Sequence, residues 1–94
     1  MDTHETRLKR LSFRAWRRGF READLILGPF VDDHARDLSP SDLDDLERLL
    51  EELDQDLYEW IIEKVETPPE FDNAIMTKLR AYRDTVYTQA GENG

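Results

Sequence analysis

The sequence predicts an all-α protein, a compact five-helix bundle without a sheet. Between turn signals, apolar residues recur every three or four positions, which is the period of a buried helix face. No segment shows the strict alternation typical of a half-buried strand. The chain has 94 residues and no cysteine, so one modest helical core must stabilise it without disulfides. We expect one domain over residues 1–87, followed by a flexible polar tail at 88–94.

The first helix is expected over residues 3–18. Asp2 or Thr3 can cap its start, and the arginines that precede Gly19 suit the negative end of a helix dipole. Glycine ends helices in a left-handed conformation, so we expect Gly19 to close this helix. The apolar face comprises Leu8, Leu11 and Ala15.

The second helix, residues 20–35, is apolar on nearly every side, which is typical of a helix packed between others. We therefore expect it at the centre of the bundle. Gly28 and Pro29 predict a kink or a division into two short helices, because proline lacks an amide donor and clashes with the preceding turn. Its apolar residues include Leu25, Ile26, Leu27, Phe30 and Val31.

Two helices are expected after Ser39-Pro40, which is a strong start signal with serine as the cap and proline in the first turn. Asp54 is expected to cap the second of them. Both have a regular apolar face. These faces comprise Leu43, Leu46, Leu50 and Leu53 in the first helix, and Leu57, Trp60, Ile61 and Val65 in the second.

The fifth helix is expected from about Glu70 to Thr85, because Pro68 and Pro69 stop the preceding helix. Its apolar positions are spaced by four, four, three and four residues. They are Phe71, Ile75, Leu79, Tyr82 and Val86.

Charge divides the chain into a short basic segment and a long acidic one. Residues 7–21 contain seven basic and no acidic residues, whereas residues 22–94 contain 6 basic and 20 acidic residues, a net charge of −14. The basic segment could meet nucleic acid, an acidic protein surface or the rest of its own fold. The longest apolar run, residues 25–27, is too short to span a membrane, and the start lacks the apolar region of a signal peptide, so we expect a soluble, unprocessed protein.

The residues needed for most kinds of catalysis are missing, so we expect no enzyme. His4 and His34 have no triad context, and the four glycines are too scattered for a phosphate-binding loop. Acidic residues around His34 could gather a metal ion, but an acidic helix end is the commoner explanation. The carboxylates opposite the leucine face are expected in solvent, where they lack the tuned pKa of an acid or base catalyst.

Two functional alternatives use other surfaces. Phe13 and Trp16 share the first helix with arginines, and alternating aromatic and basic side chains can stack on single-stranded nucleic acid. The acidic remainder of the chain opposes such binding. The other alternative is an interaction module in which the acidic leucine helix pairs with a partner helix.

The segment Arg18-Gly19-Phe20-Arg21-Glu22 places a cation, a glycine and an anion within five residues. One explanation is structural, with a glycine cap and an Arg18–Glu22 pair one turn apart. The other is a docking surface on which both charges are exposed beside free amide groups.

The order RRGFRE, Asp24-Leu25, Pro29-Phe30 and Leu57-Tyr58-Glu59-Trp60-Ile61 resembles the SdhE-like succinate dehydrogenase assembly factor family, small proteins with an RGxxE motif. The resemblance covers about residues 7–85 and implies a five-helix bundle. It also implies a non-catalytic factor, or chaperone, that binds the immature flavoprotein subunit of succinate dehydrogenase, or of fumarate reductase, and promotes its autocatalytic covalent attachment of FAD.

On this resemblance, FAD belongs to the partner and the chain has no cofactor or metal of its own. The implied partner-binding residues are Arg18, Gly19 and Glu22, flanked by Phe20, Arg21 and Arg10. We expect a monomer when free, with neither nucleic acid nor membrane as a partner. We also expect a bacterial cytoplasmic location, or the mitochondrial matrix if the chain is eukaryotic.

Overall fold

The computed structural model describes residues 3–93, with side chains to residue 86. Within residues 3–93 there are five α-helices, two 3₁₀ turns and no strand, which confirms the expected all-α five-helix fold. The helices are α1 (His4–Trp16), α2 (Arg21–His34), α3 (Pro40–Leu49), α4 (Asp54–Ile61) and α5 (Ala74–Asn93). The 3₁₀ turns are Ala35–Asp37 and Pro69–Phe71.

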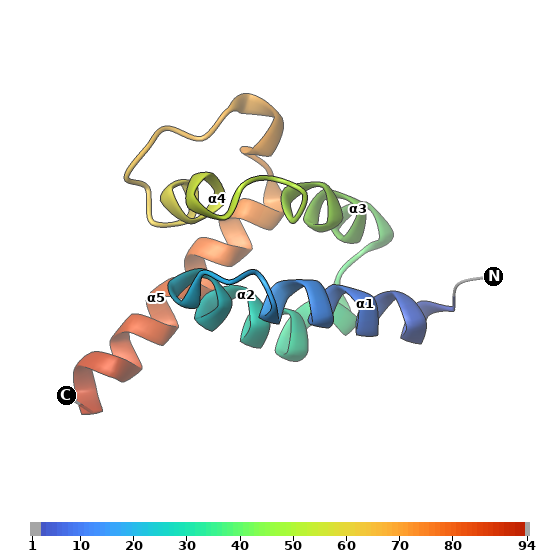
Figure 1. Ribbon diagram of the computed structural model, residues 1–94, viewed down its shortest axis with the longest axis horizontal. Helices are drawn as coiled ribbons and strands as arrows, with labels where there is room; N and C mark the ends of the chain where they lie inside the picture. The colour runs from blue at the N-terminus through green and yellow to red at the C-terminus, as the bar shows by residue number, and fades with distance from the viewer. Residues whose placement is uncertain (1–2, 94) are drawn as a thin grey trace.

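Helix α2 lies at the centre of the bundle, as expected. It runs back along α1 and also contacts α4 and α5 (Figure 1). Helices α3 and α4 form a second layer across from the α1–α2 pair, and α5 packs against both layers before its end extends away from the bundle (Figure 1). The turn between α1 and α2 therefore lies at one end of the layer that these two helices form (Figure 1).

The core is apolar throughout the part of the chain whose side chains are described, with no buried polar or charged residue there. Every helix contributes to it. The largest fully buried side chains are Leu11, Ile26, Leu27, Phe30, Leu43, Leu46, Leu49, Leu57, Ile61, Ile75, Met76 and Leu79. Trp60 and Phe71, both expected in the core, are buried and stacked with ring centroids 5.2 Å apart.

Three expected core positions are exposed. One of them, Leu25, is 47% exposed within α2, and the other two lie beyond the end of a helix. Leu53 is 74% exposed because α3 ends at Leu49, so the leucine spacing no longer holds it on the buried face. Val65 is 44% exposed because α4 ends at Ile61. On α3, Leu49 is buried in addition to the expected Leu43, Leu46 and Leu50.

Helix α2 continues through Pro29, so of the two expected outcomes, a kink or a division into two short helices, the division is wrong. Glycine is needed at position 28 for a separate reason, because the indole of Trp16 lies directly against the backbone there. A Cβ on Gly28 would meet Cδ2 of Trp16 at 2.3 Å. The Trp16 Nε1 donates to Asp32 at 2.8 Å, which fixes the ring across α2. The close packing of α1 on α2 therefore requires glycine at this position.

The end of α4 is closed by a left-handed residue that is not glycine. Glu63 has φ 64°, and its N–H donates to the carbonyl of Trp60 at 3.2 Å, while the N–H of Lys64 donates to Glu59 at 2.9 Å. This pair of bonds is the Schellman pattern of a helix end.

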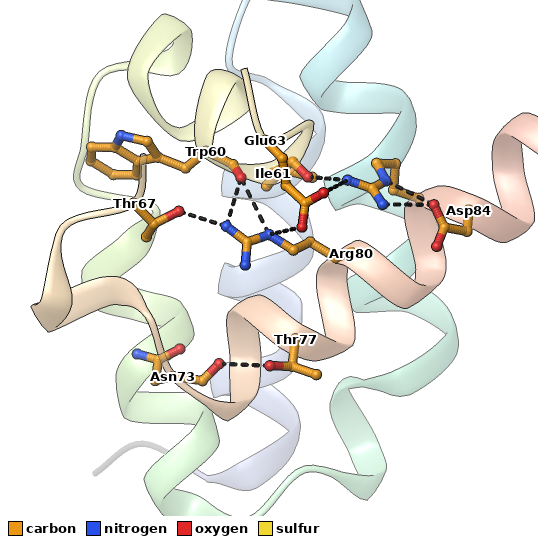
Figure 2. A network of polar contacts seen from close by, with 9 residues as sticks. Trp60, Ile61, Glu63, Thr67, Asn73, Thr77, Arg80 and Asp84 are labelled. Atoms are coloured by element: carbon orange, nitrogen blue, oxygen red, sulfur yellow. Dashed lines mark hydrogen bonds and ion pairs between the residues drawn. The ribbon is translucent and has the colours of Figure 1, made fainter. Parts of the chain in front are cut away.

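Two arginines of α5 hold this helix end from outside (Figure 2). Arg80 donates to the carbonyl of Trp60 at 3.0 Å and to the Thr67 hydroxyl at 2.6 Å. Arg83 donates to the carbonyl of Ile61 at 2.7 Å. The carboxylate of Glu63 lies within 3.5 and 3.7 Å of the two guanidinium groups. The long connection after α4 is therefore tied to α5.

The fifth helix begins later and ends later than expected. Asn73 accepts a hydrogen bond from the N–H of Met76 at 3.1 Å, as a helix cap does, so the residues after Pro69 form a 3₁₀ turn before α5 starts at Ala74. Helix α5 runs to Asn93, past the boundary at residue 87 where we expected a tail. The last residue of that expected tail, Gly94, lies outside the described residues.

Candidate functional site

A short link, residues 17–20, joins α1 to α2 and contains the glycine singled out in the sequence. Gly19 has φ +81°, the left-handed conformation that was expected. Helix α1 ends at Trp16, however, so Gly19 lies inside the link and not directly on the helix end. A Cβ built on Gly19 would meet no atom within 4 Å. Gly19 is therefore required by its backbone conformation, and the space beside it is open.

The side chain of Arg18 points inward, which corrects the expectation that it would be exposed. Only 8% of it is accessible. Its two terminal nitrogens donate to the carbonyls of Leu50 and Glu52, both at 2.7 Å. Its Nε lies 2.6 Å from Oδ1 of Asp54, a charge contact without the alignment of a hydrogen bond. Arg18 therefore binds the turn between α3 and α4.

The pairing of Arg18 with Glu22 that the spacing suggested is replaced by the Arg18–Asp54 contact. Sequence reasoning marked Asp54 as the cap of α4, but Leu53 holds the cap position and Asp54 is the first helical residue. The acidic residue at the start of α4 was the signal in the sequence that could have marked this contact. The carbonyls of Leu50 and Glu52 could not be recognised as acceptors from the sequence, because every residue has a backbone carbonyl.

Contacts with α2 also hold the link in place. The N–H of Arg18 donates to Oδ1 of Asp24 at 3.3 Å, and the N–H of Asp24 donates to the carbonyl of Phe20 at 2.9 Å. The half-buried Phe20 packs against the core with its ring centroid 5.1 Å from that of Tyr58. Side chains on both sides therefore fix the conformation of residues 17–20.

The remaining residues singled out for binding lie on the surface. Gly19, Arg21 and Glu22 are exposed, and we call these three residues the corner surface. Glu22 lies in the first turn of α2, where the helix dipole favours an anion. It makes no hydrogen bond or ion pair with the described residues. Arg10 is also exposed, but it lies on α1 six residues before the helix ends, about 9 Å along the axis.

The acidic residues near His34 point to neighbouring side chains of their own chain. Asp32 accepts from Ser12 at 2.7 Å as well as from Trp16, and Asp33 accepts from the Tyr82 hydroxyl at 2.9 Å. Among the described residues, no three histidine or acidic side chains are grouped in a way that could hold a metal ion.

A cavity of about 380 Å³ lies near the far end of α2 and does not adjoin the corner surface. Its walls include Phe30, His34 and Tyr82, whose rings contact one another with centroids 5.3 to 5.7 Å apart. Burial, together with the hydrogen bond to the Asp33 carboxylate, raises the pKa of Tyr82 to about 12.

Residues 9–83 match the protein family described as flavinator of succinate dehydrogenase. The match includes the whole link between α1 and α2 and all of α2, α3 and α4. The chain belongs to this family. The resemblance noted in the sequence is thereby confirmed.

Relatives of this flavinator-family chain are named succinate dehydrogenase assembly factor 2, mitochondrial. The one from Meyerozyma guilliermondii is 38% identical over 68 residues, covering 72% of this chain and 50% of the relative. The one from Dictyostelium discoideum is 37% identical over 68 residues, covering 72% and 48%. An assembly factor 2-B from Drosophila persimilis is 36% identical over 80 residues, covering 83% and 51%.

The chain spans about half the length of the curated relatives it matches. The family match over residues 9–83 contains the corner surface and the residues that hold it. In the described part of this flavinator-family chain, none of the helices combines the length and apolar character needed to span a membrane.

Proposed function

We propose that this chain is an assembly factor that binds the immature flavoprotein subunit of succinate dehydrogenase and promotes covalent attachment of FAD to it. The proposal includes the flavoprotein of fumarate reductase as a second target. Membership in the flavinator family supports the proposal, and so do the names of the relatives. We propose the bacterial cytoplasm, or the mitochondrial matrix in a eukaryote, as the compartment in which it acts.

The observation that carries this proposal is the corner surface, which is open on its outer side and fixed from within. Glu22 offers a carboxylate without a partner among the described residues, and Gly19 leaves room for close approach. The link beneath them is held by the contacts of Arg18 with the α3–α4 turn. A surface that is already ordered loses little conformational entropy when a partner binds it.

The structure changes the role that we give to the motif arginine. Arg18 positions the corner, whereas Gly19, Arg21 and Glu22 contact the partner. Phe20 supports the contact through its packing against Tyr58. Arg10 serves as a more distant contact along α1.

The proposed mechanism is orientation without catalysis by this chain. The covalent bond forms between FAD and a histidine of the partner, so FAD is the partner's cofactor. Binding energy from the corner surface selects the arrangement of the flavoprotein in which these groups meet, and groups held in a reactive geometry react far faster than freely moving ones. The chain itself then needs no nucleophile or tuned acid.

Reconstitution with purified components tests this function. The flavoprotein subunit, produced without its flavin, is incubated with FAD in the presence or absence of the chain, and covalent flavin is read by fluorescence in a denaturing gel. We expect the chain to co-purify with the subunit and to accelerate the appearance of covalent flavin. An unchanged rate with saturating chain, or no complex with the subunit, would contradict the proposal.

A further inference from the structure

The arginines of the basic segment fall into two groups in the structure. Arg7 and Arg18 are used by the fold, since Arg7 lies 2.5 Å from both Asp44 and Glu47 and Arg18 contacts Asp54. Arg14, Arg17 and Arg21 make no ion pair with the described residues, although the chain has 22 acidic residues. By contrast, all arginines after residue 21 are paired with carboxylates. They are Arg36, Arg48, Arg80 and Arg83.

An exposed aromatic ring lies among these unpaired arginines. Phe13 is 61% exposed, and the guanidinium of Arg17 lies 4.7 Å from the centre of its ring. Phe13 is two residues from both Leu11 and Ala15, so it lies about 160° around α1 from each of these buried residues. The ring therefore faces away from the bundle, and the fold gains little from it.

We infer that Phe13, Arg14 and Arg17, here called the α1 surface, form a second contact with the flavoprotein and bind a segment that combines carboxylates with an apolar side chain. This inference rests on the proposed function and extends its interface beyond the corner surface. Two arginines without carboxylate partners match two or more carboxylates, and guanidinium groups bind carboxylates through two parallel hydrogen bonds. The exposed ring matches an apolar side chain that covers it.

The composition of the α1 surface is that of a protein interface. Aromatic residues and arginine are enriched at the centres of such interfaces, and arginine is prominent among the residues whose loss most weakens binding. The contact between Arg17 and Phe13 holds the guanidinium in place before a partner arrives. Less side-chain freedom is then lost on binding.

Charge favours a protein segment over nucleic acid as the occupant. Asp44 and Glu47 of α3 lie against Arg7, seven to ten residues from Arg14 and Arg17, which is about 10 to 15 Å along α1. Charges farther apart than the Debye length of about 10 Å at 0.1 M salt are largely screened, so these carboxylates oppose only a longer nucleic acid that extends along α1 toward Arg7. The net charge of −9 adds to this repulsion. A short acidic segment can contact the three residues alone.

The test measures association of the flavin-free flavoprotein subunit with wild type, with R14E/R17E and with F13S. The matched charge control is R36E/K64E, which changes the same total charge at exposed positions elsewhere. V65S is the control for loss of an exposed apolar side chain. R14Q/R17Q is added because it removes the charges without reversing them, and circular dichroism establishes that each variant folds.

We expect R14E/R17E to associate at least about tenfold more slowly at low salt, because opposite charges steer encounter, and the difference to shrink as salt is added. R14Q/R17Q should show a smaller loss, and F13S should dissociate faster at any salt. The two control variants should behave as wild type does.

Three results would overturn the inference. Wild-type association by folded R14E/R17E and F13S would reject the α1 surface while leaving the proposed function in place. A wild type that neither binds the subunit nor promotes flavin attachment would reject the proposed function as well. Binding of wild type to single-stranded DNA or RNA at about 50 mM salt, lost in R14Q/R17Q, would assign the surface to nucleic acid.

Discussion

Arg18 and Asp54, 36 positions apart in the sequence, are in contact, with Nε of the arginine 2.6 Å from Oδ1 of the aspartate. This contact joins the link between α1 and α2 to the start of α4. Together with the hydrogen bonds to the carbonyls of Leu50 and Glu52, it makes the shape of the corner surface depend on the turn between α3 and α4.

Replacing Arg18 should therefore destabilise the fold. Arg18→Ala leaves the carbonyls of Leu50 and Glu52 without their donors, and we expect the free energy of unfolding to fall by about 2–3 kcal/mol. Arg18→Lys should recover only part of this, because an ammonium group cannot reach three acceptors as a guanidinium does. Urea denaturation measures both. Arg21→Ala, at an exposed arginine in the same corner, is the control, and equal stability of Arg18→Ala and Arg21→Ala would refute the positioning role.

Gly28→Ala should destabilise the protein although alanine is the better helix former. The new methyl group would lie 2.3 Å from the Trp16 ring, so the indole must move and give up its hydrogen bond to Asp32. We expect a loss of about 1–3 kcal/mol from this overpacking. In a Trp16→Ala background the same substitution should cost nothing or stabilise by up to about 1 kcal/mol. An equal cost in both backgrounds would show that Trp16 is not the reason for the glycine.

Arg80→Met should loosen the connection between α4 and α5. The substitution keeps an unbranched side chain but removes the donors to the carbonyl of Trp60 and the Thr67 hydroxyl (Figure 2). We expect a loss of about 1–3 kcal/mol and faster hydrogen exchange within residues 62–73. Lys78→Met, at an exposed position of the same helix, is the control. Unchanged exchange in Arg80→Met would argue against this tie.

Ionisation of Tyr82 should lower the free energy of unfolding in the alkaline range. Burial first, and then Asp33, raise its pKa to about 12 in the folded state, compared with about 10 in the unfolded chain. The folded state therefore holds the phenolic proton more tightly. The stability that this contributes is complete below pH 10 and is lost as the pH rises from about 10 to about 12.

Ultraviolet titration of wild type against Tyr82→Phe isolates the ionisation of this group, and urea denaturation at several pH values follows the stability. Asp33→Asn should lower the pKa of Tyr82, because it replaces the carboxylate acceptor with a neutral one. A Tyr82 that ionises near pH 10 in the folded protein would contradict the structure.

The helices and most of the core could be predicted because their signals are local. The start of α3 at Ser39-Pro40 follows from side-chain chemistry within one turn, and the leucine spacing of α3 gives its buried face. Errors occurred where packing overrides local preference. Pro29 remains inside α2 because that helix is held on several sides, and Leu53 is exposed because α3 stops one turn early.

The candidate site could be located from the sequence, but the inward direction of Arg18 could not. The left-handed Gly19 and the exposed Glu22 follow from residue type and position. The acceptors of Arg18 are backbone carbonyls of a distant turn, and no residue type marks a carbonyl as an acceptor. Arg7 is paired with distant carboxylates, and with 22 acidic residues in the chain nothing in the sequence separated the arginines that form such pairs from the unpaired Arg14 and Arg17.

The central claim is that the corner surface, and Glu22 above all, acts on the flavoprotein. The exposed side chain of Glu22 makes no hydrogen bond or ion pair within the described part of the chain, so Glu22→Ala should change the free energy of unfolding by no more than about 0.5 kcal/mol. Glu51→Ala removes a carboxylate from an exposed position outside the corner surface and is the matched control.

The decisive measurement is the rate of covalent flavin formation on the flavoprotein subunit with each folded variant. We predict that Glu22→Ala lowers this rate by at least about tenfold, as the loss of a central interface residue does, whereas Glu51→Ala matches wild type. A folded Glu22→Ala variant that promotes flavin attachment as fast as wild type would contradict the account.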